Sequence, residues 1–216
     1  MLSFLCCRQF YISRILLCLA ISSLTPFVYA HSASKSILVL GDSLSAEYGL
    51  VRGQGWVSLM EKKLADSNPN STVINASISG ETTSGGKTRL PALVNKLKPD
   101  IVIIELGGND ALRGLALSAS EENFRSMITA AKKANADVLL VGMKVPPNYG
   151  KEYTQSFFSL YTKLAKEQKI RLVPFLLEGI AERDDLFQAD RIHPIASAHP
   201  LILNNVWPQL APLLTK

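Results

Sequence analysis

The chain has 216 residues, of which 47% are hydrophobic and 19% charged, and its net charge is +5. Even without a leader of about thirty residues, it is long enough for one domain to bury a real core unaided. The basic residues are scattered and are not interleaved with aromatic ones, which argues against a nucleic-acid groove. We therefore expect no nucleic-acid partner.

Residues 1–30 have the pattern of a secretion signal. Arg8 and Arg14 precede the apolar run "ILLCLAISSLTPFVYA", whose last three residues suit signal peptidase. We expect cleavage after Ala30, which leaves residues 31–216 as a single domain in the periplasm or secreted. An uncleaved anchor is the alternative, but the run is shorter than the ~20 residues of a spanning helix and contains serine, threonine and proline. No stable membrane insertion is expected after cleavage.

The expected mature chain contains no cysteine, because Cys6, Cys7 and Cys18 all lie in the leader. We therefore expect no disulfide in the mature chain, although disulfides are common in exported proteins. Without the two leader arginines, 21 Lys and Arg face 18 Asp and Glu, a net charge of +3. This mild excess is compatible with a modest attraction to anionic lipids or substrates.

Apolar runs rich in β-branched residues alternate along the chain with segments of helical spacing. Such runs suit strands that are buried on both faces. The strands are predicted near 36–41, 72–77, 100–107, 137–143 and 170–175, and the helices near 54–67, 85–98, 120–135, 152–168 and 196–214. This alternation predicts an α/β fold, a three-layer α/β/α sandwich with a five-stranded parallel sheet and the flavodoxin-like strand order 2-1-3-4-5.

Ligands of such sheets bind beyond the carboxyl ends of the strands. The loops after the first three predicted strands read "GDSLSAEYG", "SGETTSGG" and "GGNDALRG". We therefore look for the chemistry in these loops.

His193 is the strongest candidate for a general base among the three histidines of the expected mature chain. Asp190 precedes it by three residues, an offset that brings a carboxylate to the imidazole in a turn. His31 lies at the expected new N-terminus, and His199 has no acidic residue within four positions. The bland alternative is that Asp190 only caps a helix.

Ser43 is the candidate nucleophile that such a pair would activate. It follows the first predicted strand, where its hydroxyl would be exposed at the sheet edge near a helix N-terminus. The commoner role of Ser43 or Ser45 after a strand is an N-cap. The G-x-S-x-G elbow of α/β-hydrolases is absent.

Acyl transfer also requires donors for the tetrahedral oxyanion. Gly80 offers an amide that no side chain shields, and Asn109 offers a side-chain N–H. Taken singly, both are ordinary turn residues. Together with Ser43 and His193, they are predicted to lie on one edge of the sheet.

The segments "GDSLS", the glycine of "SGET", "GGND" and "DRIHP" resemble, in order and spacing, the four blocks of the SGNH (GDSL) hydrolase family. The resemblance extends over nearly the whole mature chain. It implies a hydrolase of carboxylic esters and thioesters, acting on acyl-CoA-like thioesters, aryl esters and lysophospholipids through an acyl-enzyme. No metal or organic cofactor is implied.

The resemblance also implies roles for single residues. The implied catalytic residues are Ser43 as nucleophile, His193 as general base and acid, and Asp190 as its orienting partner. The implied oxyanion hole consists of the Ser43 amide, the Gly80 amide and the Asn109 side chain.

Further residues of the loops receive secondary roles from the resemblance. Asp42 would hold the Ser43 turn, and Glu47, where relatives often carry a small residue, would bring a carboxylate close to the site. Leu112, Leu115 and Leu117 would contact the acyl chain, with ordinary core packing as the alternative.

The stretch "SGETTSGGKTRL" favours a different class of protein, a P-loop nucleotide-binding domain. That motif requires four residues between its first glycine and Gly-Lys, whereas Gly80 and Gly86 enclose five. Glu81 would also repel a phosphate. We expect the Gly-Lys-Thr to open an ordinary surface helix.

Two more classes of protein fit the same sequence. One is a carbohydrate O-acetyl esterase, and the other is a non-catalytic periplasmic domain that binds lipids or sugars. A pure binder has no need of Ser43, Asp190 and His193 together. We expect a monomer whose partner is a small acyl ester or thioester.

Overall fold

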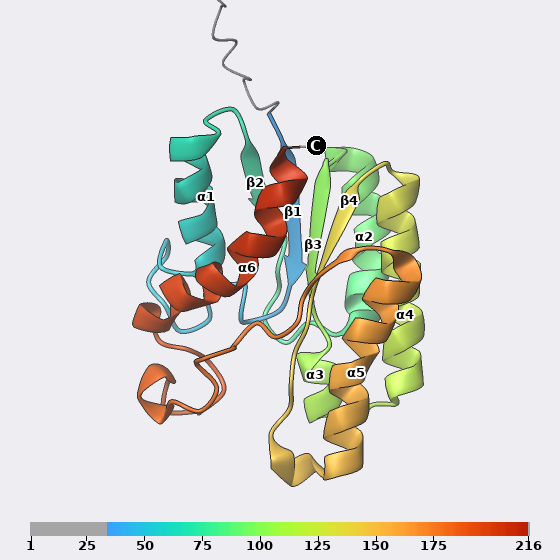
Figure 1. Cartoon of the computed structure of the whole chain (residues 1–216), viewed down its shortest axis with the longest axis vertical. Coiled ribbons are helices and arrows are strands. Elements are labelled where there is room, and N and C mark those ends of the chain that lie inside the picture. Colours follow the sequence, from blue (N-terminus) through green and yellow to red (C-terminus); the bar gives the residue numbers. More distant parts are fainter. Residues whose placement is uncertain (1–33, 216) are drawn as a thin grey trace, which may run out of the picture. The chain divides into compact units, whose positions relative to one another are not determined.

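The computed structural model describes residues 34–215. The expected leader, its cleavage site and His31 lie outside this range. Five strands form one parallel sheet in the order β2-β1-β3-β4-β5 (Figure 1), which confirms the predicted fold class and strand order. The strands are β1 (Ser36–Gly41), β2 (Thr72–Asn75), β3 (Ile101–Glu105), β4 (Asp137–Val141) and β5 (Arg171–Val173).

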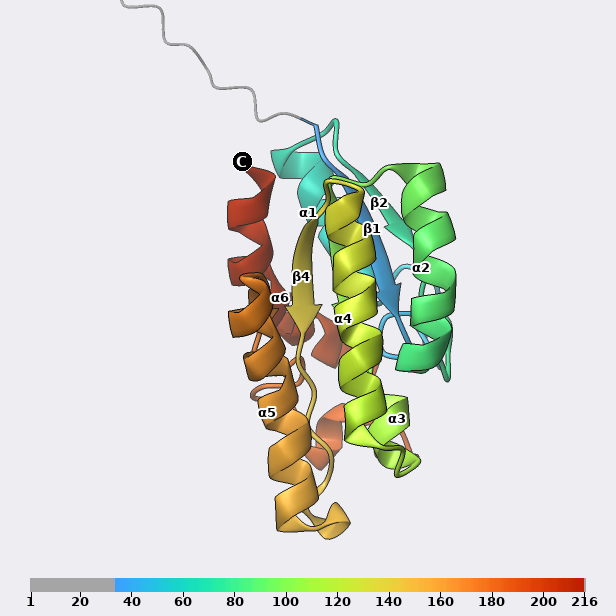
Figure 2. The ribbon, with the colours of Figure 1, turned by 90° about the vertical axis from the view of Figure 1, so that its right-hand side faces the viewer.

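Helices cover both faces of the sheet. Helices α1 and α6 pack together on one face, and α2, α4 and α5 lie side by side on the other (Figure 2). The α-helices are α1 (Trp56–Ser67), α2 (Thr83–Leu97), α3 (Gly108–Leu112), α4 (Leu117–Lys133), α5 (Lys151–Gln168) and α6 (His199–Leu214). Short 3₁₀ turns are η1 (Pro147–Tyr149), η2 (Asp184–Leu186) and η3 (Ala196–Ala198).

The central strands β1, β3 and β4 are apolar runs whose interior residues are buried, as the lack of polar alternation predicted. Strand β2 differs, because Thr72 and Asn75 are exposed and the residues between them are only partly buried. In β5, Arg171 and Leu172 are likewise only partly buried. The prediction of burial on both faces is therefore wrong for β2 and β5, which lie at the two edges of the sheet and have a neighbouring strand on one side only.

Helix α3 was not predicted, because a five-residue helix is too short for apolar periodicity to show. It begins after Gly107, whose φ of 100° is unfavourable for other residues. A Cβ atom at Gly107 would also lie 2.5 Å from the Tyr161 hydroxyl oxygen. The tight turn places Asn109 on the first turn of α3, beside the end of β3.

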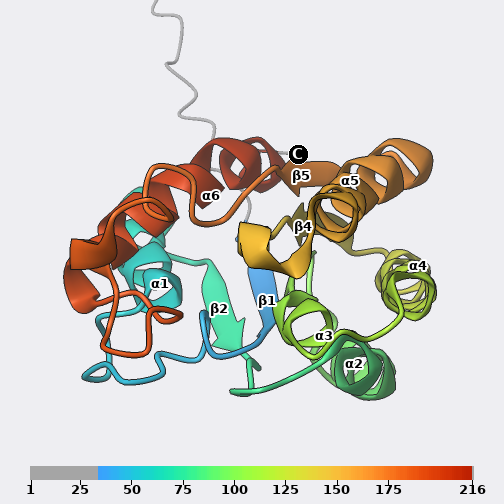
Figure 3. The ribbon, with the colours of Figure 1, turned by 90° about the horizontal axis from the view of Figure 1, so that it is seen from below.

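All five strands point the same way, so their carboxyl ends form one edge of the molecule. Figure 3 looks onto this edge and shows that the loops after β1, β2, β3 and β4 gather there. The carboxyl edge is therefore the place to look for the site.

None of the helices within residues 34–215 is long and apolar enough to cross a membrane.

Candidate active site

Ser43 lies in a tight turn directly after β1. The Asp42 carbonyl accepts hydrogen bonds from the amides of Ser45 (3.3 Å) and Ala46 (3.0 Å), and the Ser43 carbonyl accepts one from Tyr48 N at 3.3 Å. Helix α1 begins only at Trp56. The expectation of a helix N-terminus next to Ser43 is therefore wrong, since the chain makes an isolated turn there.

The structure brings Ser43, His193 and Asp190 together although 147 positions separate Ser43 from Asp190 in the printed sequence. The Ser43 Oγ atom lies 2.8 Å from Nε2 of His193, and Nδ1 of that ring lies 2.6 Å from Oδ2 of Asp190. If Nδ1 carries the proton that Asp190 accepts, Nε2 is free to accept the hydroxyl proton of Ser43. This geometry allows proton transfer from the serine to the imidazole.

Asp190 is held as a carboxylate. Its Oδ1 accepts hydrogen bonds from the backbone amides of Ile192 at 2.9 Å and His193 at 3.0 Å. The backbone amide of His193, followed by the hydrogen bond from its ring, lowers the pKa of Asp190 to about 2. The Asp-x-x-His spacing thus produces a turn that fixes both the carboxylate and the imidazole.

Asn109 and Asp42 are joined across the end of the sheet. The Nδ2 atom of Asn109 donates to Oδ2 of Asp42 and to the carbonyl of Glu81, both at 3.0 Å. The other oxygen of Asp42 accepts the amide of Leu44 at 3.0 Å. The orientation of the Asn109 amide is therefore fixed, and Asp42 holds the Ser43 turn as expected.

Gly80 follows β2 with a φ of 79°, a backbone conformation that favours glycine. Its carbonyl accepts a hydrogen bond from Nη2 of Arg113 at 3.1 Å. Within residues 34–215, neither the Gly80 amide nor the Ser43 amide donates to a protein acceptor. Both N–H groups can therefore donate to an oxygen of a substrate.

A buried acid, Glu105, supports the Ser43 turn from below, and sequence reasoning did not find it. Its Oε2 accepts the Ser45 hydroxyl at 2.7 Å and the Asp42 amide at 3.3 Å. Its Oε1 is buried with no hydrogen-bond partner in the described part of the chain. A Cβ atom at Gly41, which pairs with Glu105 in the sheet, would lie 2.8 Å from Oε2, so this glycine makes room for the acid.

Burial is the main cause of the raised pKa values of the two acids next to the Ser43 turn, Asp42 and Glu105. It raises the pKa of Asp42 to about 6, although the Leu44 amide opposes this shift. Burial also raises the pKa of Glu105 well above its usual range, and the nearby charge of Asp42 adds to the effect. Both causes favour the neutral form of the Glu105 carboxyl group.

The hydrogen bonds of Glu47 are made with the loop before α1 and the first turns of that helix, and none joins it to Ser43, His193 or Asp190 in the described part of the chain. The carboxylate accepts hydrogen bonds from the amides of Gly53 (3.0 Å) and Gly55 (2.8 Å) and from the Ser58 hydroxyl at 2.9 Å. These contacts organise the loop that leads into α1. The hydrogen bonds of Glu47 therefore support the fold.

His199 is buried in the core and is not close enough to Ser43 to form a hydrogen bond with it. Its Nδ1 accepts the amide of Trp56 at 3.0 Å, at the start of α1. Burial lowers the pKa of His199, which favours the neutral ring that this hydrogen bond requires. Sequence reasoning correctly set this residue aside.

Tyr48 is an addition that the sequence did not reveal. Its ring lies against His193, with 4.3 Å between the ring centroids and 38° between the planes. Half of the Tyr48 side chain is exposed. The aromatic ring thus flanks the imidazole at the mouth of the site, and its place two positions after the GDSLSA segment was the signal available.

The three leucines expected to contact an acyl chain differ in burial. Leu115 is 42% exposed, whereas Leu112 and Leu117 are partly buried and pack against the core. Tyrosines from η1 and α5 hold this segment: Tyr149 donates to the Leu112 carbonyl at 3.2 Å, and Tyr153 donates to the Leu115 carbonyl at 3.3 Å. Of the three, Leu115 is the most exposed.

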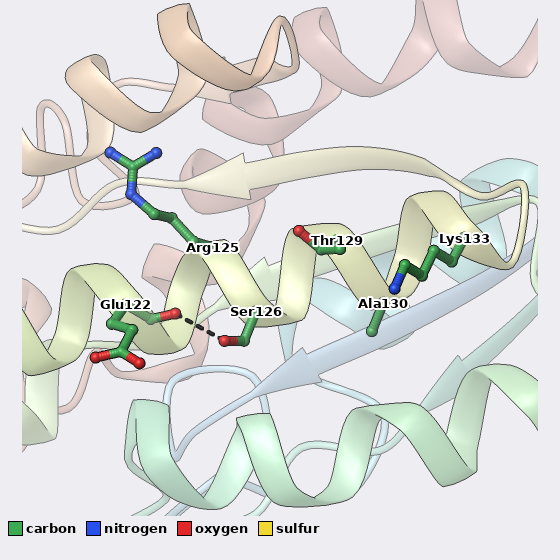
Figure 4. A pocket seen from close by; sticks show the side chains of 6 residues that line it. All are labelled: Glu122, Arg125, Ser126, Thr129, Ala130 and Lys133. Carbon is green, nitrogen blue, oxygen red and sulfur yellow. Dashed lines mark hydrogen bonds between the residues drawn. The ribbon is translucent and has the colours of Figure 1, made fainter.

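Two surface depressions lie away from Ser43. One, of about 410 Å³, lies along the outer side of α4 and is shown in Figure 4. The other, of about 480 Å³, lies beside Leu117, Tyr149 and Tyr153. Only the second adjoins the loops of the site, and among the described residues no cluster of His, Cys, Asp or Glu is arranged to hold a metal ion.

A hydrogen-bonded serine, histidine and aspartate at the carboxyl edge of a parallel α/β sheet is an arrangement found in serine hydrolases. The chain belongs to the GDSL-like lipase/acylhydrolase family, whose model matches residues 39–201. It is an acyl ester hydrolase, and the family suggested by the sequence is confirmed. The P-loop and non-catalytic readings are not favoured.

Named relatives agree with this membership. Esterase TesA of Pseudomonas aeruginosa is 49% identical over 197 residues, which cover 91% of this chain and 96% of that protein. Thioesterase 1/protease 1/lysophospholipase L1 of Escherichia coli is 40% identical over 183 residues, covering 85% and 86%. The crystal structure of the psychrotrophic esterase EstA from Pseudoalteromonas sp., inhibited by monoethylphosphonate, superposes with a TM-score of 0.80 at 38% identity, covering 85% of this chain and all of that one.

Proposed function

We propose that this protein hydrolyses carboxylic esters and thioesters through an acyl-enzyme on Ser43. The observation that carries the proposal is the chain of contacts from Ser43 Oγ to His193 at 2.8 Å and from His193 to Asp190 at 2.6 Å. A serine hydroxyl is a weak nucleophile until an adjacent base removes its proton. His193 is the only group in hydrogen-bond contact with Ser43 Oγ in the described structure that can act as that base.

In the first step, Ser43 Oγ attacks the carbonyl carbon while His193 takes the hydroxyl proton. The imidazolium that forms is stabilised by the ionised Asp190 at its Nδ1. Collapse of the tetrahedral intermediate breaks the bond to the alcohol or thiol, which leaves with the proton from His193. Water then attacks the acyl-enzyme by the same route and releases the carboxylic acid.

The oxyanion of each tetrahedral intermediate needs donors. We assign this role to the amides of Ser43 and Gly80 and to Nδ2 of Asn109. The Asn109 amide is already oriented by Asp42 and Glu81, so little reorganisation is required when charge develops. An oxyanion would share one of the Asn109 N–H groups with these acceptors.

The substrate is assigned only to a broad class, the acyl esters and thioesters. Aryl esters, lysophospholipids and acyl-CoA-like thioesters all present an acyl carbonyl with a leaving group outside the site. Names such as esterase and thioesterase/lysophospholipase among the relatives support this breadth. Exposed Leu115 and Tyr48 offer apolar contacts for an acyl chain.

A direct test labels the chain from residue 31 onward with a serine-directed fluorophosphonate. We expect modification of Ser43, identified by peptide mass, and hydrolysis of chromogenic esters of increasing acyl length. Ser43→Ala should lose both. Equal hydrolysis by Ser43→Ala and the wild type would refute the mechanism, and an acyl-length profile with its maximum at acetate would support the O-acetyl esterase instead.

We also propose that residues 1–30 direct export to the periplasm, with cleavage after Ala30, and that the mature chain is a monomer. The charged start and apolar run of this segment support export. The mass of the exported protein should correspond to a chain that begins at His31. An uncleaved chain in the membrane fraction would contradict this proposal.

A further inference from the structure

Large apolar side chains that remain exposed are concentrated at one edge of the molecule. Seven are exposed within residues 34–215, and six of them lie in the connections at the carboxyl edge of the sheet, Tyr149 at the end of η1. These six side chains, which we call the apolar rim, are Tyr48, Val51, Ile78, Leu115, Tyr149 and Ile192. The seventh, Leu201, lies on helix α6.

The residues of the apolar rim lie on five separate connections between strands and helices. They are the loops after β1, β2, β3 and β4 and the segment that carries His193, and Figure 3 shows them from the side on which they gather. Val51 is the most exposed of the set at 71%, and its amide donates to the Gln54 side chain in the same loop. One acyl chain bound at Ser43 does not account for apolar side chains on every loop of this edge. Several large apolar side chains exposed on neighbouring connections at one edge (Figure 3) indicate an interaction site.

Basic side chains accompany the apolar rim. Arg52 follows Val51, Arg191 precedes Ile192, and Lys151 lies two positions after Tyr149. Arg113 lies two positions before Leu115. All four cations are exposed, and none of them forms an ion pair in the part of the chain that the structure describes.

Most acidic side chains at this edge either form an ion pair or hydrogen bonds, or lie away from the apolar rim in the sequence. Asp190 pairs with His193, Glu81 pairs with Arg89, and Glu47 is held by backbone amides. Unpaired Glu182 and Asp184 lie at and next to η2, which carries no member of the apolar rim. Glu152, beside Lys151, is the one unpaired acid next to a rim residue. The basic side chains that border the rim therefore have no acidic partner in the described part of the chain, and Arg113 donates only to the Gly80 carbonyl.

From this pairing of apolar and basic side chains we infer that the apolar rim is a docking surface for an anionic lipid bilayer. Apolar side chains would enter the boundary between headgroups and acyl chains, while the arginines and the lysine would meet lipid phosphates. Contact would be reversible and would place the Ser43 opening against the lipid. The inference does not depend on the proposed hydrolysis, because docking requires no reaction.

The test measures sedimentation of the chain from residue 31 onward with vesicles, in a Ser43→Ala background so that lipid is not consumed. The vesicles contain equal parts of phosphatidylglycerol and phosphatidylcholine, or phosphatidylcholine alone. We expect binding to the anionic vesicles that weakens as salt rises. Val51→Asp should lower the partition coefficient by about tenfold and Arg52→Ser by about fivefold.

Matched controls separate docking from unspecific loss of apolar or basic character. Leu201→Asp introduces the same change on a helix, and Lys133→Ser removes a cation at the end of α4, so both should bind like the parent. In the active background, Val51→Asp and Arg52→Ser should keep the kcat/KM of a short water-soluble ester, and circular dichroism should show that they fold.

Three results would overturn the inference. The first is absence of binding to anionic vesicles at low salt, and the second is an equal loss of binding in Leu201→Asp and Val51→Asp. The third is a dimer in light scattering that Val51→Asp converts to a monomer, because the rim would then be covered by a second copy of the chain.

Discussion

Glu105 supports the nucleophile turn through two bonds, one to the Asp42 amide and one to the Ser45 hydroxyl. These residues flank Ser43 on both sides, so the direction of the Ser43 amide depends on them. A charged Glu105 would have one buried oxygen without a donor and the Asp42 carboxyl nearby. A neutral acid fits this place better than a carboxylate.

We predict that Glu105→Gln preserves activity and gains stability, relative to the wild type, as pH rises. Because the pKa of Glu105 is raised on folding, the unfolded chain releases this proton first, and the wild type loses stability as pH rises above the ordinary pKa near 4.5. Glutamine has no proton to release. The free energy of unfolding in urea, measured from pH 4 to pH 8, should diverge in favour of the variant.

Glu105→Leu provides the contrasting case, since it leaves the Ser45 hydroxyl and the Asp42 amide unpaired. It should lose about 1–3 kcal/mol of stability and also label more slowly with fluorophosphonate. Val102→Ala, on the same strand, should lose about 2 kcal/mol with unchanged labelling. Equal labelling rates in these two variants would show that Glu105 has no positioning role.

Asp190 should remain a carboxylate, able to orient His193, throughout the pH range in which the enzyme is active. Its pKa of about 2, lowered chiefly by the His193 amide, keeps it ionised wherever the imidazole can be neutral. Asp190→Asn should lower kcat by about 10³–10⁴-fold, because the imidazolium loses the carboxylate that stabilises it. Asp184→Asn, an exposed acid nearby, should change kcat less than twofold, and a similar loss in both variants would contradict the assignment.

Single residues were predictable when a local motif marked them. Asp190 and His193 lie three positions apart, and Ser43 follows a recognisable strand, so each could be named from the sequence. Tyr48 and Glu105 could not, because their roles come from contacts with segments far away in the chain. Glu105 also closes an apolar run, where its burial has no sequence signal.

The segment that joins α3 to α4 is held against the start of α5 by tyrosine hydroxyls. Tyr153 donates to the carbonyls of Ala111 and Leu115, each at 3.3 Å, and Tyr149 donates to Leu112. The Ala111 and Leu112 carbonyls lie in the last turn of α3, and the Leu115 carbonyl lies three residues beyond its end. Arg113 reaches across to the Gly80 carbonyl from the same segment.

We predict that Tyr153→Phe loosens this connection without unfolding the protein. The Ala111 and Leu115 carbonyls share the single hydroxyl proton of Tyr153, and its loss should cost about 1 kcal/mol. Amides of residues 111–117 should exchange hydrogen about tenfold faster. The KM of long-chain esters should rise more than that of acetate esters, because Leu115 would be less well placed. Tyr149→Phe, which removes one bond, should give the smaller effect, and unchanged exchange in Tyr153→Phe would contradict the prediction.

At the scale of elements, periodicity predicted all five strands and the five long helices within a few residues. It failed at α3, where five residues are fewer than two helical turns. The burial predicted for β2 and β5 also failed, although the predicted strand order already placed both at the edges of the sheet. Their apolar composition resembles that of the central strands, so burial has to be inferred from the strand order and not from the apolar run alone.

The core of residues 34–215 extends over both faces of one sheet. Trp56 on α1 is buried on one face, and Phe157 and Tyr161 on α5 are buried on the other. Helices pack on both faces of strands β1, β3 and β4. If either helical layer unfolded, it would expose the same strands to water. The two layers are therefore coupled through the sheet.

We predict that the chain from residue 31 onward unfolds in one transition. Both tryptophans, Trp56 and Trp207, lie on the α1 and α6 face, so their fluorescence reports that layer, whereas far-UV circular dichroism reports all helices. The two urea curves should share one midpoint, which a reductant should not shift because this part of the chain has no cysteine. A variant with Trp56→Phe, Trp207→Phe and Phe158→Trp moves the probe to α5 on the other face. Its fluorescence midpoint should again match its circular dichroism, and separate midpoints would show that the layers unfold independently.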